Sequence, residues 1–126
     1  MTNPKKILIV EDNEKNMKLM RDLLQYAGYD TFESTTAEDA LVRVNELRPD
    51  LILMDIQLPG MSGAEALTQL RANEATKRIP VVAVTASVMT HDRGNLISLG
   101  FDDYQSKPLE IKEFLDRVAR NLTLDS

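Results

Sequence analysis

The chain has 126 residues, of which 43% are apolar, and its 15 basic and 20 acidic side chains give a formal net charge of −5. This length suits one domain with a substantial core, and the acidic balance argues against direct binding of nucleic acid, which depends on clustered Lys and Arg. The sequence has no apolar run long enough to span a membrane, no apolar signal core near Met1 and no cysteine for disulfides or thiol chemistry.

The first half of the chain alternates apolar and amphipathic segments. Gly28 ends the first amphipathic helix, a capping box from Thr36 to Asp39 opens the second, and Pro49 closes it. The segment 30–34 alternates polar and apolar residues, which is typical of a strand at a sheet edge. The expected strands in this half are 5–10, 30–34 and 51–54, and the expected helices are 13–27 and 36–47.

The second half repeats this alternation. A capping box from Ser62 to Glu65 opens the third helix, Pro80 precedes the fourth strand, and Gly100 ends the fourth helix. The last strand is only partly apolar, which again indicates a sheet edge. The expected strands here are 81–84 and 101–104, and the expected helices are a segment starting at 62, then 88–99 and 111–122.

Five strand–helix repeats predict an α/β fold with a doubly wound, five-stranded parallel sheet of flavodoxin-like (βα)5 form. The continuously apolar strands suit the buried centre of such a sheet, and the mixed strands suit its edges. Right-handed crossovers then favour the strand order 2-1-3-4-5. We expect a single cytoplasmic domain, residues 1–126 with a core of about 5–122, with no output domain attached.

Polar side chains follow the three central strands: Glu11 and Asp12 the first, Asp55 the third and Thr85 the fourth. Because parallel strands end at one edge of the sheet, we expect these side chains to meet there. A carboxylate at a buried strand end is costly without a partner, and clustered carboxylates repel one another. A hard cation such as Mg²⁺ resolves this repulsion. Zinc is disfavoured because cysteine is absent and His91 is the lone histidine.

Lys107 follows the fifth strand and can reach Asp55 in the expected strand order. Mg²⁺ and the ammonium would meet the charge on the equatorial oxygens of a phosphoryl group, and Thr85 would donate a hydrogen bond. Asp55 would then be the nucleophile that forms an acyl phosphate. Plainer interpretations stay open, with Lys107 in a simple salt bridge, Thr85 as a strand-end cap and Glu11 as a solvated acid.

The residues around these positions carry a family resemblance. The supporting segments are 7–13 (ILIVEDN), 53–63 (LMDIQLPGMSG), 84–86 (VTA) and 107–108 (KP). Together they resemble the receiver domain of bacterial two-component response regulators, which has a CheY-like architecture, over residues 5 to about 122. The first two segments are most similar to stand-alone regulators of the DivK type.

This resemblance implies a phosphorylation-dependent signalling switch in a two-component system or phosphorelay. Asp55 would accept a phosphoryl group from a histidine kinase or a histidine phosphotransfer protein. Asp12 and Asp55 would bind Mg²⁺ directly, with Mn²⁺ as a substitute, while Glu11 would act largely through water and Gln57 through its backbone carbonyl. The chain would assist only its own phosphorylation and dephosphorylation and would not otherwise be an enzyme.

The resemblance also implies how the signal leaves the site. Lys107, Thr85 and the backbone N–H of Ala86 would bind the phosphoryl oxygens, and the peptide between Lys107 and Pro108 would be cis. Thr85 and Tyr104 would form a switch pair in which the aromatic ring turns inward, although an edge-strand tyrosine often only packs. The partner surface would comprise Val88, Met89 and Tyr104. The chain would bind a downstream protein target, relay phosphate onward or control a kinase, as a monomer or a weak phosphorylation-dependent dimer.

Two other functions fit the residues less well. Phosphohydrolases of the haloacid dehalogenase type place a second Asp two residues after the nucleophile, where this chain has Gln57, which cannot transfer that proton. A flavodoxin-type cofactor site needs a first loop rich in Gly, Ser and Thr, but loop 11–14 (EDNE) repels phosphate without a metal. In the receiver interpretation, Gln57 and Ser87 adjoin the path of the attacking water and would tune the loss of phosphate.

Overall fold

The computed structural model describes residues 4–85 and 97–123. Its strands are β1 (Lys6–Val10), β2 (Asp30–Ser34), β3 (Leu51–Asp55), β4 (Val81–Thr85) and β5 (Asp103–Ser106), and its helices are α1 (Glu14–Tyr26), α2 (Ala37–Leu47), α3 (Gly63–Ala72) and α5 (Ile111–Thr123). All neighbouring strands pair in parallel, in the order β2-β1-β3-β4-β5. The predicted fold class and strand order are therefore confirmed.

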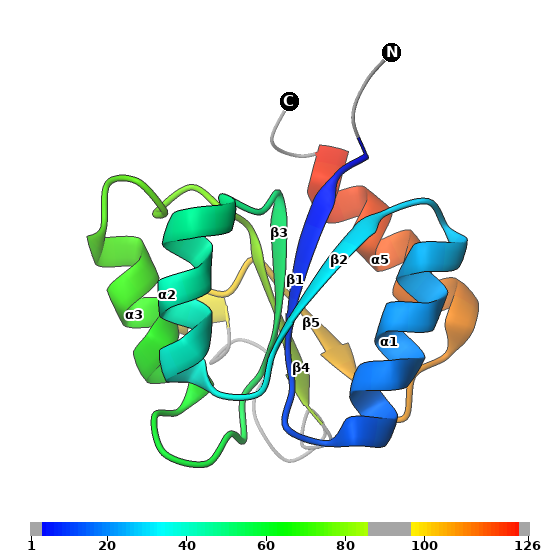
Figure 1. Cartoon of the computed structure of the whole chain (residues 1–126), viewed down its shortest axis with the longest axis horizontal. Coiled ribbons are helices and arrows are strands. Elements are labelled where there is room, and N and C mark those ends of the chain that lie inside the picture. Colours follow the sequence, from blue (N-terminus) through cyan, green and yellow to red (C-terminus); the bar gives the residue numbers. More distant parts are fainter. Residues whose placement is uncertain (1–3, 86–96, 124–126) are drawn as a thin grey trace.

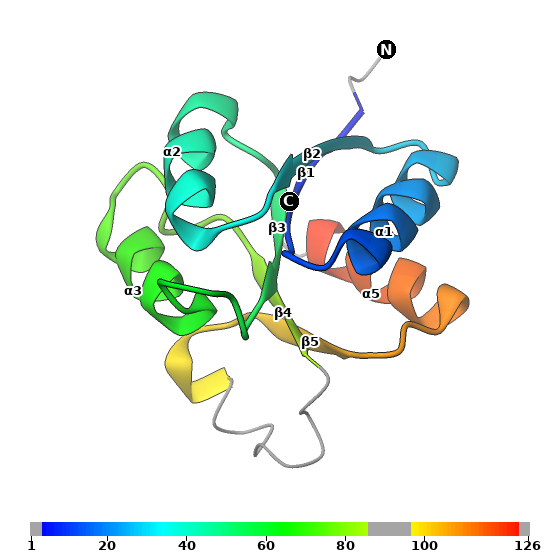
Figure 2. The ribbon, with the colours of Figure 1, turned by 60° about the horizontal axis from the view of Figure 1, so that its bottom comes forward.

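The helices cover both faces of the sheet. α2 and α3 lie on one side and α1 and α5 on the other (Figure 1, Figure 2). Successive residues of β1 alternate between the two resulting cores: Leu8 and Val10 belong to one buried cluster, and Ile7 and Ile9 to the other. This two-sided burial explains why the central strands are continuously apolar.

Local signals in the sequence account for the helix ends. The Asn13 side chain caps α1 by accepting a hydrogen bond from the backbone N–H of Asn16, at 3.0 Å. Gly28 follows that helix with a φ of 97°, in the left-handed region that glycine enters without strain. Thr36 caps α2. Ser62 and Glu65 form the reciprocal capping box predicted for α3.

The predicted bounds of the last strand are wrong. β5 begins at Asp103, not at 101, and runs to Ser106. Phe101 is only 2% exposed and packs into the core on the α2–α3 side before pairing with β4 begins. Gln105 can lie within the strand because its side chain bonds Glu113 and Arg117 of α5, so a polar segment forms the edge strand.

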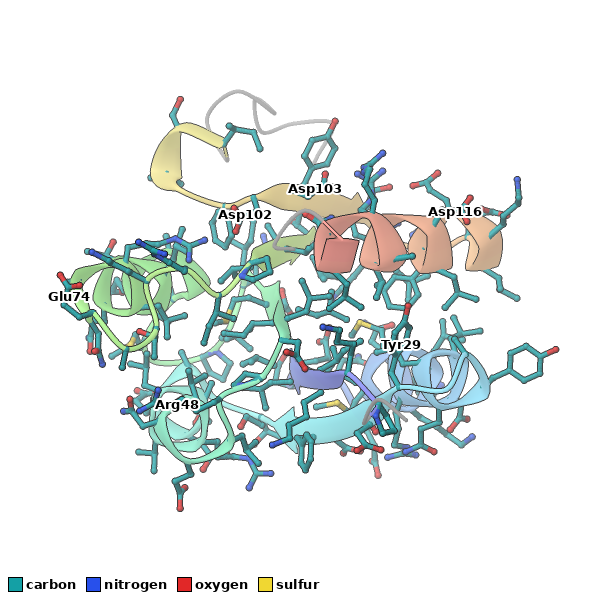
Figure 3. The ribbon with its side chains drawn as sticks, turned by 90° about the horizontal axis from the view of Figure 1, so that it is seen from above. Tyr29, Arg48, Glu74, Asp102, Asp103 and Asp116 are labelled. Atoms are coloured by element: carbon teal, nitrogen blue, oxygen red, sulfur yellow. The ribbon has the colours of Figure 1, made fainter. Side chains whose placement is uncertain are left out.

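Most of the predicted helix 88–99 lies outside the described residues, and 97–99 are helical just before Gly100. Figure 3 looks at the molecule from above and shows Asp103 beside α5 at the β5 edge. Among the described helices, none is long and apolar enough to cross a membrane.

Candidate functional site

Four strand ends meet at one edge of the sheet, as the topology predicts. Glu11 and Asp12 follow β1, Asp55 ends β3, Thr85 ends β4, and Lys107 follows β5. Glu11, Asp12 and Asp55 each contribute a carboxylate oxygen to a group whose members all lie within 4.8 Å of one another. The adjacency of β1 and β3 is what brings these three side chains together.

Asp55 is held at its place by backbone contacts. Its side chain is nearly buried, and Oδ1 accepts a hydrogen bond from the backbone N–H of Gln57 at 3.0 Å. Gly63 lies against the same residue: a Cβ there would come within 2.7 Å of the Asp55 carbonyl oxygen. Sequence reasoning placed Gly63 only in the cap of α3. Its close approach to β3 depends on how α3 packs, which no local pattern shows.

Lys107 lies between two carboxylates. Its Nζ forms an ion pair with Glu11 Oε1 at 2.9 Å and donates to Asp55 Oδ2 at 3.4 Å. The Glu11 side chain is 0% exposed and that of Lys107 is 17% exposed. Glu11 is thus a buried acid with a charged partner and not the solvated acid that the sequence left open.

Burial and charge shift the pKa values of this pair. Burial raises the pKa of Glu11, and nearby Asp55 adds to that effect, while hydrogen bonds from Lys107 and the Asn13 backbone only partly oppose it. Burial alone would lower the pKa of Lys107, but its contacts with Glu11 and Asp55 outweigh this and raise it. Lys107 therefore remains an ammonium, the one cation of the described residues that contacts both Glu11 and Asp55.

The donor set fits a hard divalent cation. It consists only of oxygen, its three carboxylates lie within 4.8 Å of one another, and Asp12 is exposed so that water can reach it. A cavity of about 390 Å³ lies beside the acids, where α1 and the end of β2 meet. Its lining residues are Glu11, Asp12, Glu14, Met17, Arg21, Glu33 and Thr35.

Some of the remaining predicted site residues lie within the part of the chain that the structure describes, and others lie outside it. Thr85 is buried, and its carbonyl accepts a hydrogen bond from the Lys107 backbone N–H at 3.0 Å. The peptide between Lys107 and Pro108 is cis, as the resemblance implies. Tyr104 is half-buried and packs against the core on the α2–α3 side. Ala86, Ser87, Val88, Met89 and His91 lie outside the described residues.

Residues 7–119 match the family described as response regulator receiver domain. The chain belongs to this family. It is 45% identical over 119 residues to the polar-differentiation response regulator DivK of Brucella anthropi, an alignment that covers 94% of this chain and 97% of that protein. DivK of Brucella ovis is also 45% identical, over 118 residues that cover 94% of this chain and 96% of the relative.

Solved receiver structures share the fold. A response regulator from Chloroflexus aurantiacus superposes with a TM-score of 0.90 at 29% identity, covering 95% of this chain and 98% of the other. The receiver domain of sensor histidine kinase PA1611 from Pseudomonas aeruginosa, with a magnesium ion in its active-site cleft, has a TM-score of 0.88 at 32% identity with the same coverage. This receiver domain is therefore a signalling protein of two-component systems, whose general function is a phosphorylation switch.

Proposed function

We propose that Asp55 is the phosphoacceptor of this receiver domain and that the donor is a phosphohistidine of a kinase or a phosphotransfer protein. A carboxylate oxygen of Asp55 attacks phosphorus, the bond from phosphorus to the histidine nitrogen breaks, and its electron pair returns to the imidazole. The observation that carries this proposal is the position of Asp55, nearly buried and within 3.4 Å of the Lys107 ammonium.

Each neighbour has a distinct part in this reaction. Lys107 offsets negative charge on the transferred group. Glu11 holds the Lys107 ammonium at 2.9 Å and so fixes where that charge lies. Glu11, Asp12, Asp55 and the backbone carbonyl of Gln57 would hold Mg²⁺, which when bound neutralises charge on the phosphoryl oxygens. Thr85 would donate its hydroxyl to the same oxygens.

The output is a change in protein contacts. Thr85 and Tyr104 would move together once Asp55 is phosphorylated, and the surface that includes Tyr104 would bind a downstream protein target. Gln57 stands two residues after the acceptor, where an amide cannot serve as an acid or base. We therefore propose that the phosphoryl group is kept as a signal and that phosphate monoesters are not turned over.

Phosphorylation with a small donor tests the proposal. The protein is incubated with acetyl phosphate and Mg²⁺, and its intact mass is measured. We expect a gain of one phosphoryl group in the wild type and none in Asp55→Asn or after addition of a chelator. Asp50→Asn, at the opposite end of β3, is the matched control and should be phosphorylated like the wild type.

Two results would overturn the assignment: a wild-type mass that stays unchanged, or a gain that persists in Asp55→Asn. Rapid hydrolysis of p-nitrophenyl phosphate that depends on Asp55 would point instead to a phosphohydrolase.

A further inference from the structure

Arg117 of α5 contacts three successive residues of the edge strand β5. Its Nη1 donates to Asp103 Oδ1 at 2.7 Å, and its Nε donates to Gln105 Oε1 at 3.0 Å. Its guanidinium carbon lies 5.3 Å from the centroid of the Tyr104 ring. Side chains alternate between the faces of a strand, and Tyr104 packs against the core on the α2–α3 side. Arg117 therefore reaches around the edge of the sheet.

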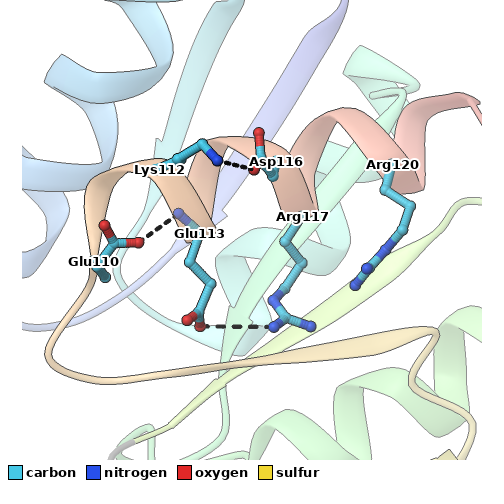
Figure 4. A pocket seen from close by; sticks show the side chains of 6 residues that line it. All are labelled: Glu110, Lys112, Glu113, Asp116, Arg117 and Arg120. Carbon is cyan, nitrogen blue, oxygen red and sulfur yellow. Dashed lines mark hydrogen bonds and ion pairs between the residues drawn. The ribbon is translucent and has the colours of Figure 1, made fainter.

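Hydrogen bonds and ion pairs hold the Arg117 guanidinium on the α5 side of the sheet. The side chain of Arg117 is 17% exposed and that of Asp103 is 13% exposed. Asp103 also accepts hydrogen bonds from Arg120 at 2.8 Å and Asn121 at 2.9 Å. Figure 4 shows the ion pair of Arg117 with Glu113, at 3.6 Å, on the same helix. These bonds fix the position of the guanidinium, so its distance from the ring depends mainly on where Tyr104 lies.

We propose that Arg117 is a positioning residue that holds the Tyr104 ring in the orientation seen here and thereby opposes phosphorylation-linked switching. The cation attracts the face of the ring. A turn of the ring changes the distance of that face from a guanidinium fixed by Asp103 and Gln105. A contact made in only one of two states favours that state. The inference rests on the proposed function in one respect, that Tyr104 is the switch aromatic.

The position of the ring can be measured in the unphosphorylated protein, with the phosphorylated wild type as the reference for the direction of any shift. Fluorine NMR of protein labelled with 3-fluorotyrosine gives a signal for each of the three tyrosines, and Tyr104→Phe assigns that of Tyr104. In unphosphorylated Arg117→Ala, we expect the Tyr104 signal to move toward its position in the phosphorylated wild type. Tyr26 and Tyr29 are internal controls. Lys112→Ala, which removes an exposed cation from the same helix, should leave the Tyr104 signal in place.

The rate of phosphorylation gives a second readout. Arg117→Ala should react with acetyl phosphate about two- to five-fold faster than the wild type, because a cation–π contact of ordinary strength no longer opposes the switch. In a Tyr104→Leu background, the same Arg117→Ala change should leave the rate unaltered, since the two residues act through one contact. A general structural role for Arg117 would instead give the same rate change in both backgrounds.

Arg117→Lys keeps the charge and can still bond Asp103, but it loses the planar fork, so it should shift the Tyr104 signal less than Arg117→Ala. If circular dichroism shows that Arg117→Ala does not fold, the Tyr104 signal of Arg117→Lys tests the proposal in its place. A Tyr104 signal that stays at the wild-type position in a folded variant overturns the inference. If the wild type gains no phosphoryl group, the proposed function is wrong. A change in the Tyr104 fluorine signal between the wild type and the Arg117 variants would still show whether Arg117 holds the ring.

Discussion

Glu11 is the most buried acid of the site, and through Lys107 it links the proposed phosphoacceptor, Asp55, to the end of the fifth strand. Its side chain is 0% exposed and pairs with Lys107, which also contacts Asp55. A carboxylate buried without a partner would carry a large desolvation cost. Lys107 therefore compensates the charge of Glu11, and in the proposed function it would also bind the phosphoryl group on Asp55.

Removing Lys107 should separate metal binding from the conformational response. Lys107→Ala deletes a cation that competes for Glu11 and Asp55, and a charge about 4 Å away is worth about 1 kcal/mol in bulk water and more in a partly buried site. Calorimetry should show that Mg²⁺ still binds, with an affinity at least equal to that of the wild type. The fluorine signal of Tyr104 should no longer shift on phosphorylation. A normal shift would count against the role of Lys107, and Lys112→Ala is the matched control.

Gly63 has a steric role beside Asp55. Because a Cβ would lie 2.7 Å from the Asp55 carbonyl oxygen, Gly63→Ala must displace either β3 or α3. Overpacking of this kind costs about 1–3 kcal/mol. Urea unfolding should show that loss, and the acetyl phosphate reaction should slow because Asp55 moves.

The control for Gly63 is another glycine far from the site. Gly28→Ala strains a backbone with a φ of 97° but meets no atom within 4 Å. It should lower the free energy of unfolding by about 1–2 kcal/mol and leave the phosphorylation rate unchanged. Equal rates for both alanine variants would show that the Gly63 contact does not position Asp55.

At the scale of elements, the pairing of β5 with α5 explains why a polar segment forms a strand. Asp103 accepts hydrogen bonds from Arg117, Arg120 and Asn121 of α5 and from the backbone N–H of Tyr104. The prediction that the strand begins at 101 followed the apolar Phe101. Long-range partners on α5 satisfy the polar side chains of β5, and they are invisible to a pattern read along one segment.

The Asp103 network should make stability depend on acid pH. Burial alone would raise the pKa of Asp103, but hydrogen bonds from Arg120, Asn121 and the Tyr104 backbone, with the charge of Arg117, lower it overall. The stabilisation that ionised Asp103 contributes is thus fully present at a pH above roughly 3.9, the pKa of Asp in an unfolded chain. It is lost as the pH falls through the lower pKa that Asp103 has in the folded protein. Asp103→Asn should cost about 1.5–3 kcal/mol at pH 7.

Urea unfolding of the wild type and Asp103→Asn, from pH 7 down to pH 3, checks this prediction. The difference in the free energy of unfolding between the wild type and Asp103→Asn should become smaller only below about pH 4. Asp116→Asn is the control because that side chain is exposed and its ion pair with Lys112 spans 4.0 Å. Its effect should stay within about 0.5 kcal/mol at every pH. A constant gap between wild type and Asp103→Asn would contradict the lowered pKa.

At the scale of the whole molecule, Mg²⁺ should stabilise the fold because its proposed ligands come from two separate strands. The acids from β1 and β3 meet only in the folded chain. At a Mg²⁺ concentration about 100 times its dissociation constant, the free energy of unfolding should rise by about 2.7 kcal/mol. Thermal unfolding at matched ionic strength measures the effect. Asp12→Asn should lose most of it, and a wild-type response from that variant would exclude Asp12 as a ligand.

The amino-acid sequence by itself determined the alternation of strands and helices, the strand order and the acids at the strand ends. These follow from local periodicity and from which strands are wholly apolar. Only the tertiary structure decided that Glu11 is buried against Lys107, that Gly63 adjoins Asp55, and that Arg117 reaches Tyr104 around the sheet edge. Such contacts join residues distant in the chain, so they depend on the packing of whole elements, which no local pattern encodes.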